Sequence, residues 1–104
     1  MPDRTLSALL QAASVSERYG PLPSDPIGEI SQDSRAVAAG GCFVAVPGLR
    51  VDGHDFLAAA IGAGAGAVVV QSDRRAKWEA LLERNVIAVV EVPDSRVALA
   101  DLSA

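Results

Sequence analysis

Uninterrupted apolar runs alternate with amphipathic segments through the second half of the chain. Runs without polar positions are typical of strands covered on both faces. Three of them occur, at 42–46, 67–70 and 87–90. Segments with the length and apolar spacing of helices lie between and after them, at 52–63, 73–84 and 94–102. Strands alternating with helices predict parallel βαβ units with right-handed crossovers. We therefore expect an α/β fold, a small three-layer sandwich around a mixed, partly parallel sheet.

Polar residues and glycine mark where these elements begin and end. Asp52 is a candidate N-cap, and Asp55 is placed favourably in the first, electropositive turn of the helix that follows. Gly64 is the expected stop of that helix, because glycine adopts the left-handed conformation readily. Asp94 or Ser95 is the expected cap of the last helix.

The helix expected at 73–84 carries both apolar and basic positions. We interpret Trp78 as a helix-face anchor packed on the sheet edge rather than as a side chain that stacks on a base. Asn85 is a candidate left-handed stop. The apolar residues expected to face the sheet are Ala76, Ala80 and Leu81. The chain's main basic cluster is interpreted as a solvated face and consists of Arg74, Arg75 and Lys77.

The first third of the chain is less regular. Apolar positions at helical spacing predict a short opening helix through Leu6, Leu9, Leu10 and Ala13. The stretch 20–28 is rich in proline and glycine, which predicts a surface loop. A short strand is expected at 29–32, ended by Asp33 and Ser34.

Composition and charge narrow the class of protein. The chain has 104 residues, half of them hydrophobic but only 4% aromatic, which suits one domain with an aliphatic core. A net charge of −4 argues against nucleic-acid or anionic-membrane partners. Cys42 is the only cysteine and falls in an apolar run, which fits a reducing compartment. With no secretory signal and no unbroken apolar span, we expect a cytoplasmic protein.

The sequence contains no pattern for catalysis or metal binding. No glycine belongs to a phosphate-binding G-x-x-x-x-G-K-[ST] loop, and Lys77 is the only lysine. His54 is the only histidine, so neither a catalytic triad nor a His/Cys metal site is expected. We therefore predict no catalytic residue, no metal and no cofactor in this chain.

Two loops are candidates for binding a ligand. One carries Gln32 to Arg35 after the first strand, and the other runs from Pro47 to Asp52 after the second. Ligands of open α/β sheets collect at the carboxyl ends of the parallel strands. If these two strands run parallel side by side, both loops open on one edge and form a single cleft. Hydroxyl, amide and guanidinium donors there suit a diphosphate, and the apolar positions suit a base.

The stretch DSRAVAAGGCFVAVPGLRVDGHDF, residues 33–56, resembles the N-terminal domain of the Mur ligases, which build the UDP-linked peptidoglycan precursor. The resemblance covers nearly the whole chain and implies one UDP-substrate-binding domain over residues 1–104. It also implies that ATP and Mg²⁺ are used by the full-length enzyme, whose central and C-terminal domains are partners of this one. Matched motif to motif, the residues implied to contact UDP are Gln32, Ser34, Leu49, Arg50 and Val51.

Two further segments narrow the resemblance to the branch that acts on UDP-MurNAc-L-Ala-D-Glu and adds the third peptide residue. They are the opening LSALL, at 6–10, and VPDSR, at 92–96. The alternatives are the branch that adds D-Ala-D-Ala and a stand-alone nucleotide-sugar-binding module. The last helix has run barely two turns at Ala104, without a C-cap, which we interpret as a piece of a longer protein.

Several of these residues also have purely structural interpretations. Asp33 and Ser34 are typical of an Asx-type turn that ends a strand. Arg35 is interpreted as tying that turn to a carboxylate. His54 is placed to cap its helix or to bond Asp52 or Asp55, and we leave it out of the expected site. Asp52 is interpreted as the cap that fixes the second loop.

Overall fold

The strands that the apolar runs predict lie side by side in one sheet. The computed structural model describes residues 15–20, 28, 30–37, 39–84 and 87–103. In sheet order, the strands of this part are β1 (Glu17–Tyr19), β5 (Ala88–Val92), β4 (Ala67–Gln71), β3 (Cys42–Val44) and β2 (Ile30–Ser31). Strands β2 to β5 are mutually parallel, and β1 pairs antiparallel with β5 at one edge.

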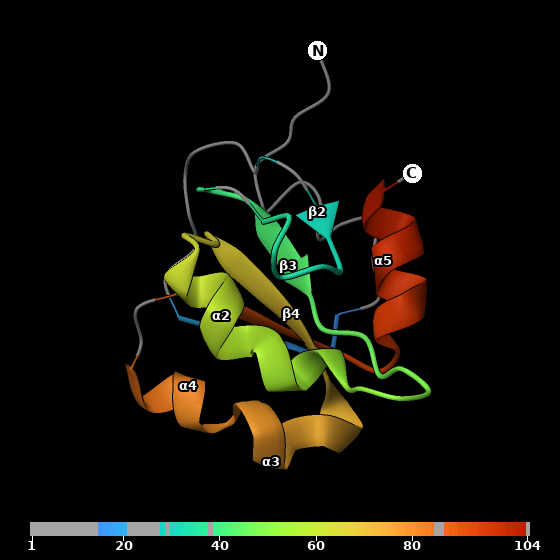
Figure 1. Ribbon diagram of the computed structural model, residues 1–104. Coiled ribbons are helices and arrows are strands. Elements are labelled where there is room, and N and C mark those ends of the chain that lie inside the picture. Colours follow the sequence, from blue (N-terminus) through green and yellow to red (C-terminus); the bar gives the residue numbers. More distant parts are fainter. Residues whose placement is uncertain (1–14, 21–27, 29, 38, 85–86, 104) are drawn as a thin grey trace.

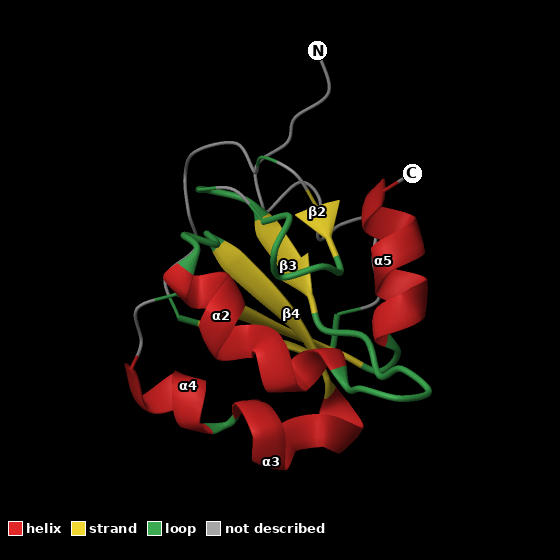
Figure 2. Cartoon of the chain, viewed as in Figure 1, coloured by secondary structure: helices red, strands yellow, loops and turns green. Residues whose placement is uncertain are grey.

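Helices cover both faces of this sheet (Figure 1). On one face lie α2 (Leu57–Gly62), α3 (Arg75–Trp78) and α4 (Ala80–Arg84), while α5 (Ser95–Ser103) lies on the other. Two short 3₁₀ helices, η1 (Gly53–Phe56) and η2 (Ser72–Arg74), lead into α2 and α3. The layers are evident when the chain is coloured by secondary structure (Figure 2). The predicted α/β three-layer arrangement around a partly parallel sheet is confirmed.

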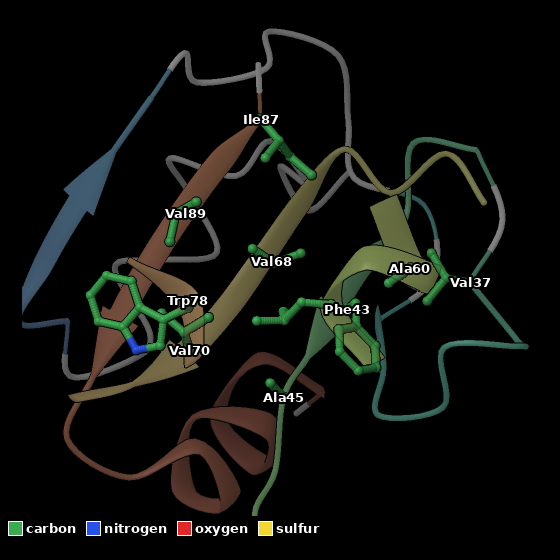
Figure 3. Close-up of a cluster of buried hydrophobic side chains, with 10 residues drawn as sticks. Val37, Phe43, Ala45, Ala60, Val68, Val70, Trp78, Ile87 and Val89 are labelled. Carbon is green, nitrogen blue, oxygen red and sulfur yellow. The ribbon is translucent and has the colours of Figure 1, made fainter. Parts of the chain in front are cut away.

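Alternate residues of each strand point to opposite faces and build two cores. The core under α2, α3 and α4 includes Phe43, Val68, Val89 and the fully buried indole of Trp78 (Figure 3). The core under α5 is aliphatic and consists of Cys42, Val44, Ala67, Val69, Ala88, Val90, Val92, Ala98 and Leu102. Because both faces are covered, the central strands read as continuous apolar runs.

The segment expected to be one helix at 73–84 is broken into η2, α3 and α4. The prediction that Ala76 and Ala80 face the sheet is wrong: both are exposed, because the side of the helix that packs on the sheet carries Trp78 and Leu81, three positions apart. Trp78 occupies the core position instead, as expected of an anchor, and its Nε1 donates a hydrogen bond to the carbonyl of Gln71 at 3.0 Å. Leu81 packs partly buried at the margin of the same core.

Of the remaining element boundaries, one strand was not predicted, and two helix ends lie where the sequence predicted them. Strand β1 was not predicted, because Glu17–Tyr19 shows no apolar alternation and its pairing partner lies some 70 residues away. Gly64 has a φ of +104° after α2, as expected of a left-handed stop. Asp94 caps α5 through its Oδ1, which accepts from the backbone N–H of Arg96. The predicted opening helix, most of the 20–28 loop and the stop at Asn85 lie outside the described residues.

Candidate functional site

The two candidate loops lie at the same edge of the sheet. Strands β2 and β3 are parallel neighbours, with Ile30 opposite Cys42 and Ser31 opposite Phe43, so their carboxyl ends open in one direction. An open hollow of about 500 Å³ lies there. It is lined by Gln32, Asp33, Ser34, Arg35, Val51, Phe56 and Ala59. The single cleft predicted from the sequence is present.

The turn after β2 is held by contacts within itself. The Asp33 Oδ1 accepts from the backbone N–H of Arg35 at 2.9 Å, and the Asp33 carbonyl accepts from the N–H of Ala36. The Arg35 guanidinium donates two hydrogen bonds to the Asp33 carboxylate, from Nε to Oδ1 at 3.2 Å and from Nη2 to Oδ2 at 3.3 Å. These bonds, first from the side chain and then from the backbone of Arg35, hold the pKa of Asp33 below its ordinary value. Both structural interpretations, the Asx-type turn and the tie by Arg35, are confirmed.

The turn nevertheless leaves donors free on the side of the hollow. The hydroxyl of Ser34 and the amide of Gln32 make no hydrogen bond among the described residues. The Arg35 side chain is 89% exposed although it is paired with Asp33. These groups are therefore available to a polar ligand in the hollow.

The loop after β3 is a tight hairpin from Val46 to Gly53. Gly53 N–H donates to the carbonyl of Val46 at 3.0 Å, and Gly48 N–H donates to the carbonyl of Val51 at 2.9 Å. Pro47 and Asp52 face each other as an isolated antiparallel bridge. The tip of the hairpin projects from the molecule, with Leu49 fully exposed and Val51 59% exposed.

A carboxylate with three donors closes this hairpin. Asp52 Oδ1 accepts from the backbone N–H of His54 at 3.0 Å and is 2.7 Å from the His54 Nδ1. Asp52 Oδ2 accepts from Nε of Arg74 at 2.8 Å. Partial burial, the largest single influence, raises the pKa of Asp52, but the bonds from His54 and Arg74 together lower it to about 2. Asp52 is therefore ionised at neutral pH, and its predicted role as N-cap is confirmed.

The buried His54 ring connects this carboxylate to the sheet. Its Nε2 accepts from the backbone N–H of Gln71 at 2.9 Å, so that nitrogen carries no proton. Nδ1 then carries the ring proton and donates to Asp52. The ring is 2% exposed and does not line the hollow. His54 is thus a structural link, consistent with leaving it out of the expected site.

The prediction that the basic cluster is a solvated face is incomplete, because its side chains also make contacts within the fold. Arg74 is bonded to Asp52, and Lys77 Nζ lies 2.8 Å from Asp55 Oδ1. The Arg75 guanidinium lies 5.0 Å from the ring centroid of Trp78. Each of these cations therefore has a partner within the fold, which the local sequence does not reveal.

Three of the five predicted contact residues line the hollow, namely Gln32, Ser34 and Val51. Leu49 and Arg50 do not: they form the exposed tip of the hairpin. Phe56 and Ala59 line the hollow but were not predicted. The sequence did contain a signal for them: Phe56 and Ala59 are three positions apart in a segment predicted to be helical, and such residues share one face of a helix. Their apolar side chains lie on the first helical turns after the hairpin.

The hollow has one polar and one apolar side. Side chains of the turn after β2 supply hydroxyl, amide and guanidinium donors, and Val51, Phe56 and Ala59 supply apolar contact. Sites of this kind orient a small ligand with a few polar groups while burying its flat apolar surface. Among the described residues that line the hollow, no nucleophile is paired with a base.

Other chemistry is limited in the part of the chain that the structure describes. The Cys42 thiol is buried, which raises its pKa to about 12 and keeps it protonated. No group of three or more His, Cys, Asp or Glu side chains in that part is placed to hold a metal ion. No helix within the described ranges is long and apolar enough to cross a bilayer.

A model of the Mur ligase family, described as its catalytic domain, matches residues 26–104. The chain belongs to the Mur ligase family. Two similar proteins are the UDP-N-acetylmuramyl-tripeptide synthetase 2 of Oceanobacillus iheyensis and the UDP-N-acetylmuramoyl-L-alanyl-D-glutamate–2,6-diaminopimelate ligase of Chlorobaculum tepidum. The first is 34% identical over 92% of this chain and 18% of that protein. The second is 49% identical over 71% of this chain and 13% of that protein.

Solved structures in this family have the same fold. The UDP-N-acetylmuramoylalanyl-D-glutamyl-2,6-diaminopimelate–D-alanyl-D-alanyl ligase of Acinetobacter baumannii superposes on 97% of this chain with a TM-score of 0.69 and 29% sequence identity. The match covers 21% of that protein. This Mur ligase chain thus spans about a fifth or less of the length of these relatives. They include both a branch named for the tripeptide and a branch named for D-alanyl-D-alanine.

Proposed function

We propose that the chain binds the UDP end of a UDP-N-acetylmuramoyl-peptide. It would do so as the N-terminal domain of a longer cytoplasmic protein, an ATP-dependent ligase of peptidoglycan synthesis. The observation that carries the proposal is the hollow at the carboxyl ends of β2 and β3. It joins free donors of the turn after β2 to an apolar wall from the hairpin and the helix after it. Membership of the Mur ligase family supplies the class of substrate.

The two sides of the hollow match the two parts of the nucleotide. A uracil ring is flat and carries donors and acceptors on its edge, so Phe56 and Val51 suit its face. The diphosphate is anionic and needs donors, which Ser34, Gln32 and the exposed Arg35 supply. Leu49 and Arg50 at the tip of the hairpin are assigned to the same ligand through their backbone, beyond the lining of the hollow.

The role of this domain would be positioning rather than chemistry. Binding energy from the remote nucleotide would hold the reacting peptide carboxylate in place for the rest of the protein. Within the described residues the site contains no phosphate-binding loop and no metal cluster. ATP and Mg²⁺, which activate the carboxylate for attack by the incoming amine, are accordingly assigned to the central and C-terminal domains of the longer protein.

The proposed step is the addition of the third residue, meso-diaminopimelate or L-lysine, to UDP-MurNAc-L-Ala-D-Glu. The segments at 6–10 and 92–96 and the tripeptide-synthetase relatives support it. Addition of D-Ala-D-Ala to the tripeptide precursor is supported equally, by the Acinetobacter baumannii structure and by a Mycobacterium leprae ligase that is 46% identical over 66% of this chain. Assaying the full-length product of the native gene with dipeptide and tripeptide precursors separates the two steps.

The test of the site is Ser34→Ala in that full-length ligase. Loss of a hydroxyl that contacts only the bound nucleotide removes about 1 kcal/mol of binding, so KM for the UDP precursor should rise roughly five-fold. The turnover number should change little. Ser16→Ala, at the exposed edge near β1, is the matched control and should leave KM unchanged. An unaltered KM in Ser34→Ala would contradict the assignment.

The rival hypothesis is a stand-alone nucleotide-sugar-binding module. Sequencing the native gene beyond the codon for Ala104 distinguishes it from the ligase hypothesis. A phosphate-binding loop such as Gly-Thr-Asn-Gly-Lys-Thr within a few dozen codons supports the ligase. An early stop codon, or an unrelated continuation, would overturn it. Titration with UDP would then establish whether the small module binds a nucleotide by itself.

A further inference from the structure

Two arginines from different elements hold the two ends of the hairpin loop. Arg96, in the first turn of α5, donates from Nη2 to the carbonyl of Pro47 at 2.8 Å. Arg74, at the end of η2, donates from Nε to the Asp52 carboxylate at 2.8 Å. Pro47 and Asp52 are the bridge pair at the base of the hairpin. The loop passes beside the start of α5, well below the label of that helix (Figure 1).

We propose that Arg96 and Arg74 are positioning residues for nucleotide binding: by tethering Pro47 and Asp52, they hold the hairpin in the one conformation that presents Val51 to the hollow. The inference rests on the proposed function, since the ligand is the nucleotide assigned there. It adds two residues that do not line the hollow and that were given no part in binding: Arg74, which belongs to the basic cluster, and Arg96, which ends the segment VPDSR.

The hairpin needs an external support. A two-stranded hairpin is marginally stable by itself in water. This one has an exposed tip, with Leu49 fully exposed and Val51 more than half exposed, so packing contributes little to its order. A loop that is mobile before binding must lose conformational entropy when the ligand binds, and that loss weakens the affinity. Tethers that order the loop beforehand remove part of this cost.

The two arginine side chains hold the hairpin but do not stabilise the helices that carry them. The cap of α5 is made by Asp94, whose Oδ1 accepts from the backbone N–H of Arg96, so the Arg96 side chain takes no part in it. The carboxylate of Asp52 keeps both bonds from His54 when Arg74 is shortened. Substituting either arginine side chain therefore loosens the loop without removing a core residue or a helix cap.

The variants are Arg96→Met and Arg74→Met, with Arg18→Met as the matched control. Arg18 is an exposed arginine in β1, at the sheet edge opposite β2, and its side chain has no partner among the described residues. Methionine keeps much of the aliphatic length and removes the donors. Arg96→Lys is a rescue variant, because an ammonium on a long side chain can still donate to a carbonyl oxygen.

The first measurement is UDP affinity and precursor kinetics in the full-length product of the native gene. Each tether variant should weaken UDP binding and raise KM roughly three- to ten-fold while kcat changes less than about two-fold. Arg96→Lys should recover most of the loss. Arg18→Met should match the wild type. Tether variants that bind UDP as tightly as Arg18→Met would overturn the positioning role and leave the proposed function intact.

The second measurement is amide hydrogen exchange in the same proteins without ligand. Exchange at Gly48 and Gly53, whose N–H groups close the hairpin, should accelerate in the tether variants. Exchange at Val69 and Val90 in the core strands should not change. Unchanged exchange at both glycines would contradict the inference that the two arginines order the hairpin. A wild-type protein that does not bind UDP at all would overturn the nucleotide role of the hairpin, and with it both the positioning role and the proposed function.

Discussion

The turn after β2 and the hairpin after β3 border the same hollow, but they are held by different contacts. The turn is stabilised by Asp33, which bonds residues two and three positions away. The hairpin is stabilised at Pro47 and Asp52 by Arg96 and Arg74, which lie 49 and 22 residues away along the chain. The turn depends on its own sequence, whereas the hairpin depends both on its local hydrogen bonds and on the packing of η2 and α5 around it.

This difference decides how each loop responds to substitution. Changes within the turn act on a few exposed bonds that water can replace, so their effect on stability is small. Changes at the base of the hairpin act on backbone contacts and on a partly buried carboxylate that joins several elements. The hairpin should therefore show the larger losses of stability, whereas substitutions in the turn should act mainly on ligand affinity.

The largest effect is expected from Gly53→Ala. A Cβ at position 53 would lie 2.7 Å from the backbone nitrogen and 2.9 Å from the carbonyl oxygen of Val46, and backbone atoms cannot move aside as a side chain can. We expect the free energy of unfolding to fall by about 3 kcal/mol. Urea denaturation measures this. Gly62→Ala, where a Cβ meets nothing within 4 Å, is the control and should be neutral or slightly stabilising.

Asp52→Ala should have the next largest effect. It removes the cap of η1, leaves the buried His54 Nδ1 proton without its acceptor, and removes one of the two carboxylates that pair with Arg74. The expected loss is about 2 kcal/mol, measured by urea denaturation at neutral pH. A loss no larger than that of Asp33→Ala would show that the hairpin is held as locally as the turn.

The low pKa of Asp52 predicts an acid-sensitive component of stability. A carboxyl whose pKa is lowered on folding, here from 3.8 to about 2, contributes stability that is complete above its unfolded pKa. That contribution is lost as the pH falls from about 4 to about 2. We expect it to be about 1 kcal/mol, since water partly screens the carboxylate from its partners. Urea denaturation of wild type and Asp52→Asn across this range measures it; parallel curves would contradict the prediction.

The smallest effect on stability is expected in the turn itself. Asp33→Ala removes the Asx-type bonds and the pairing with Arg35, but these groups are exposed to water. Stability should hardly change, and UDP affinity should fall because the turn no longer holds Ser34 in place. Isothermal titration together with urea denaturation checks both. A loss of stability comparable to that of Asp52→Ala would contradict the contrast between the two loops.

Local sequence patterns predicted the elements that carry their own signal. The central strands were found because burial on both faces requires continuous apolar runs, and Asp52, Gly64 and Asp94 act as expected because capping is local. Strand β1 was missed because Glu17–Tyr19 becomes a strand only by pairing with β5. The helical segment 73–84 was placed correctly, but it is broken into three pieces, and Ala76 and Ala80 lie on its exposed side rather than on the side of Trp78.

The same distinction applies to the candidate site. Gln32, Ser34 and Val51 were predicted and line one hollow, because parallel neighbouring strands bring their carboxyl ends to one edge. Phe56 and Ala59 were missed because their contribution depends on how α2 lies over that edge. Leu49 and Arg50 were placed in the right loop, but the tight hairpin turns them away from the hollow.

The sequence by itself determined the α/β class, the central strands, the turn at Asp33 and the family, since each depends on residues close together in the chain. Tertiary structure alone decided the link from His54 to Gln71 and the tethers of Arg74 and Arg96. These contacts join residues 17 to 49 positions apart. A hydrogen bond needs its atoms within about 3 Å, and over such separations only the packed sheet and helices fix which atoms meet.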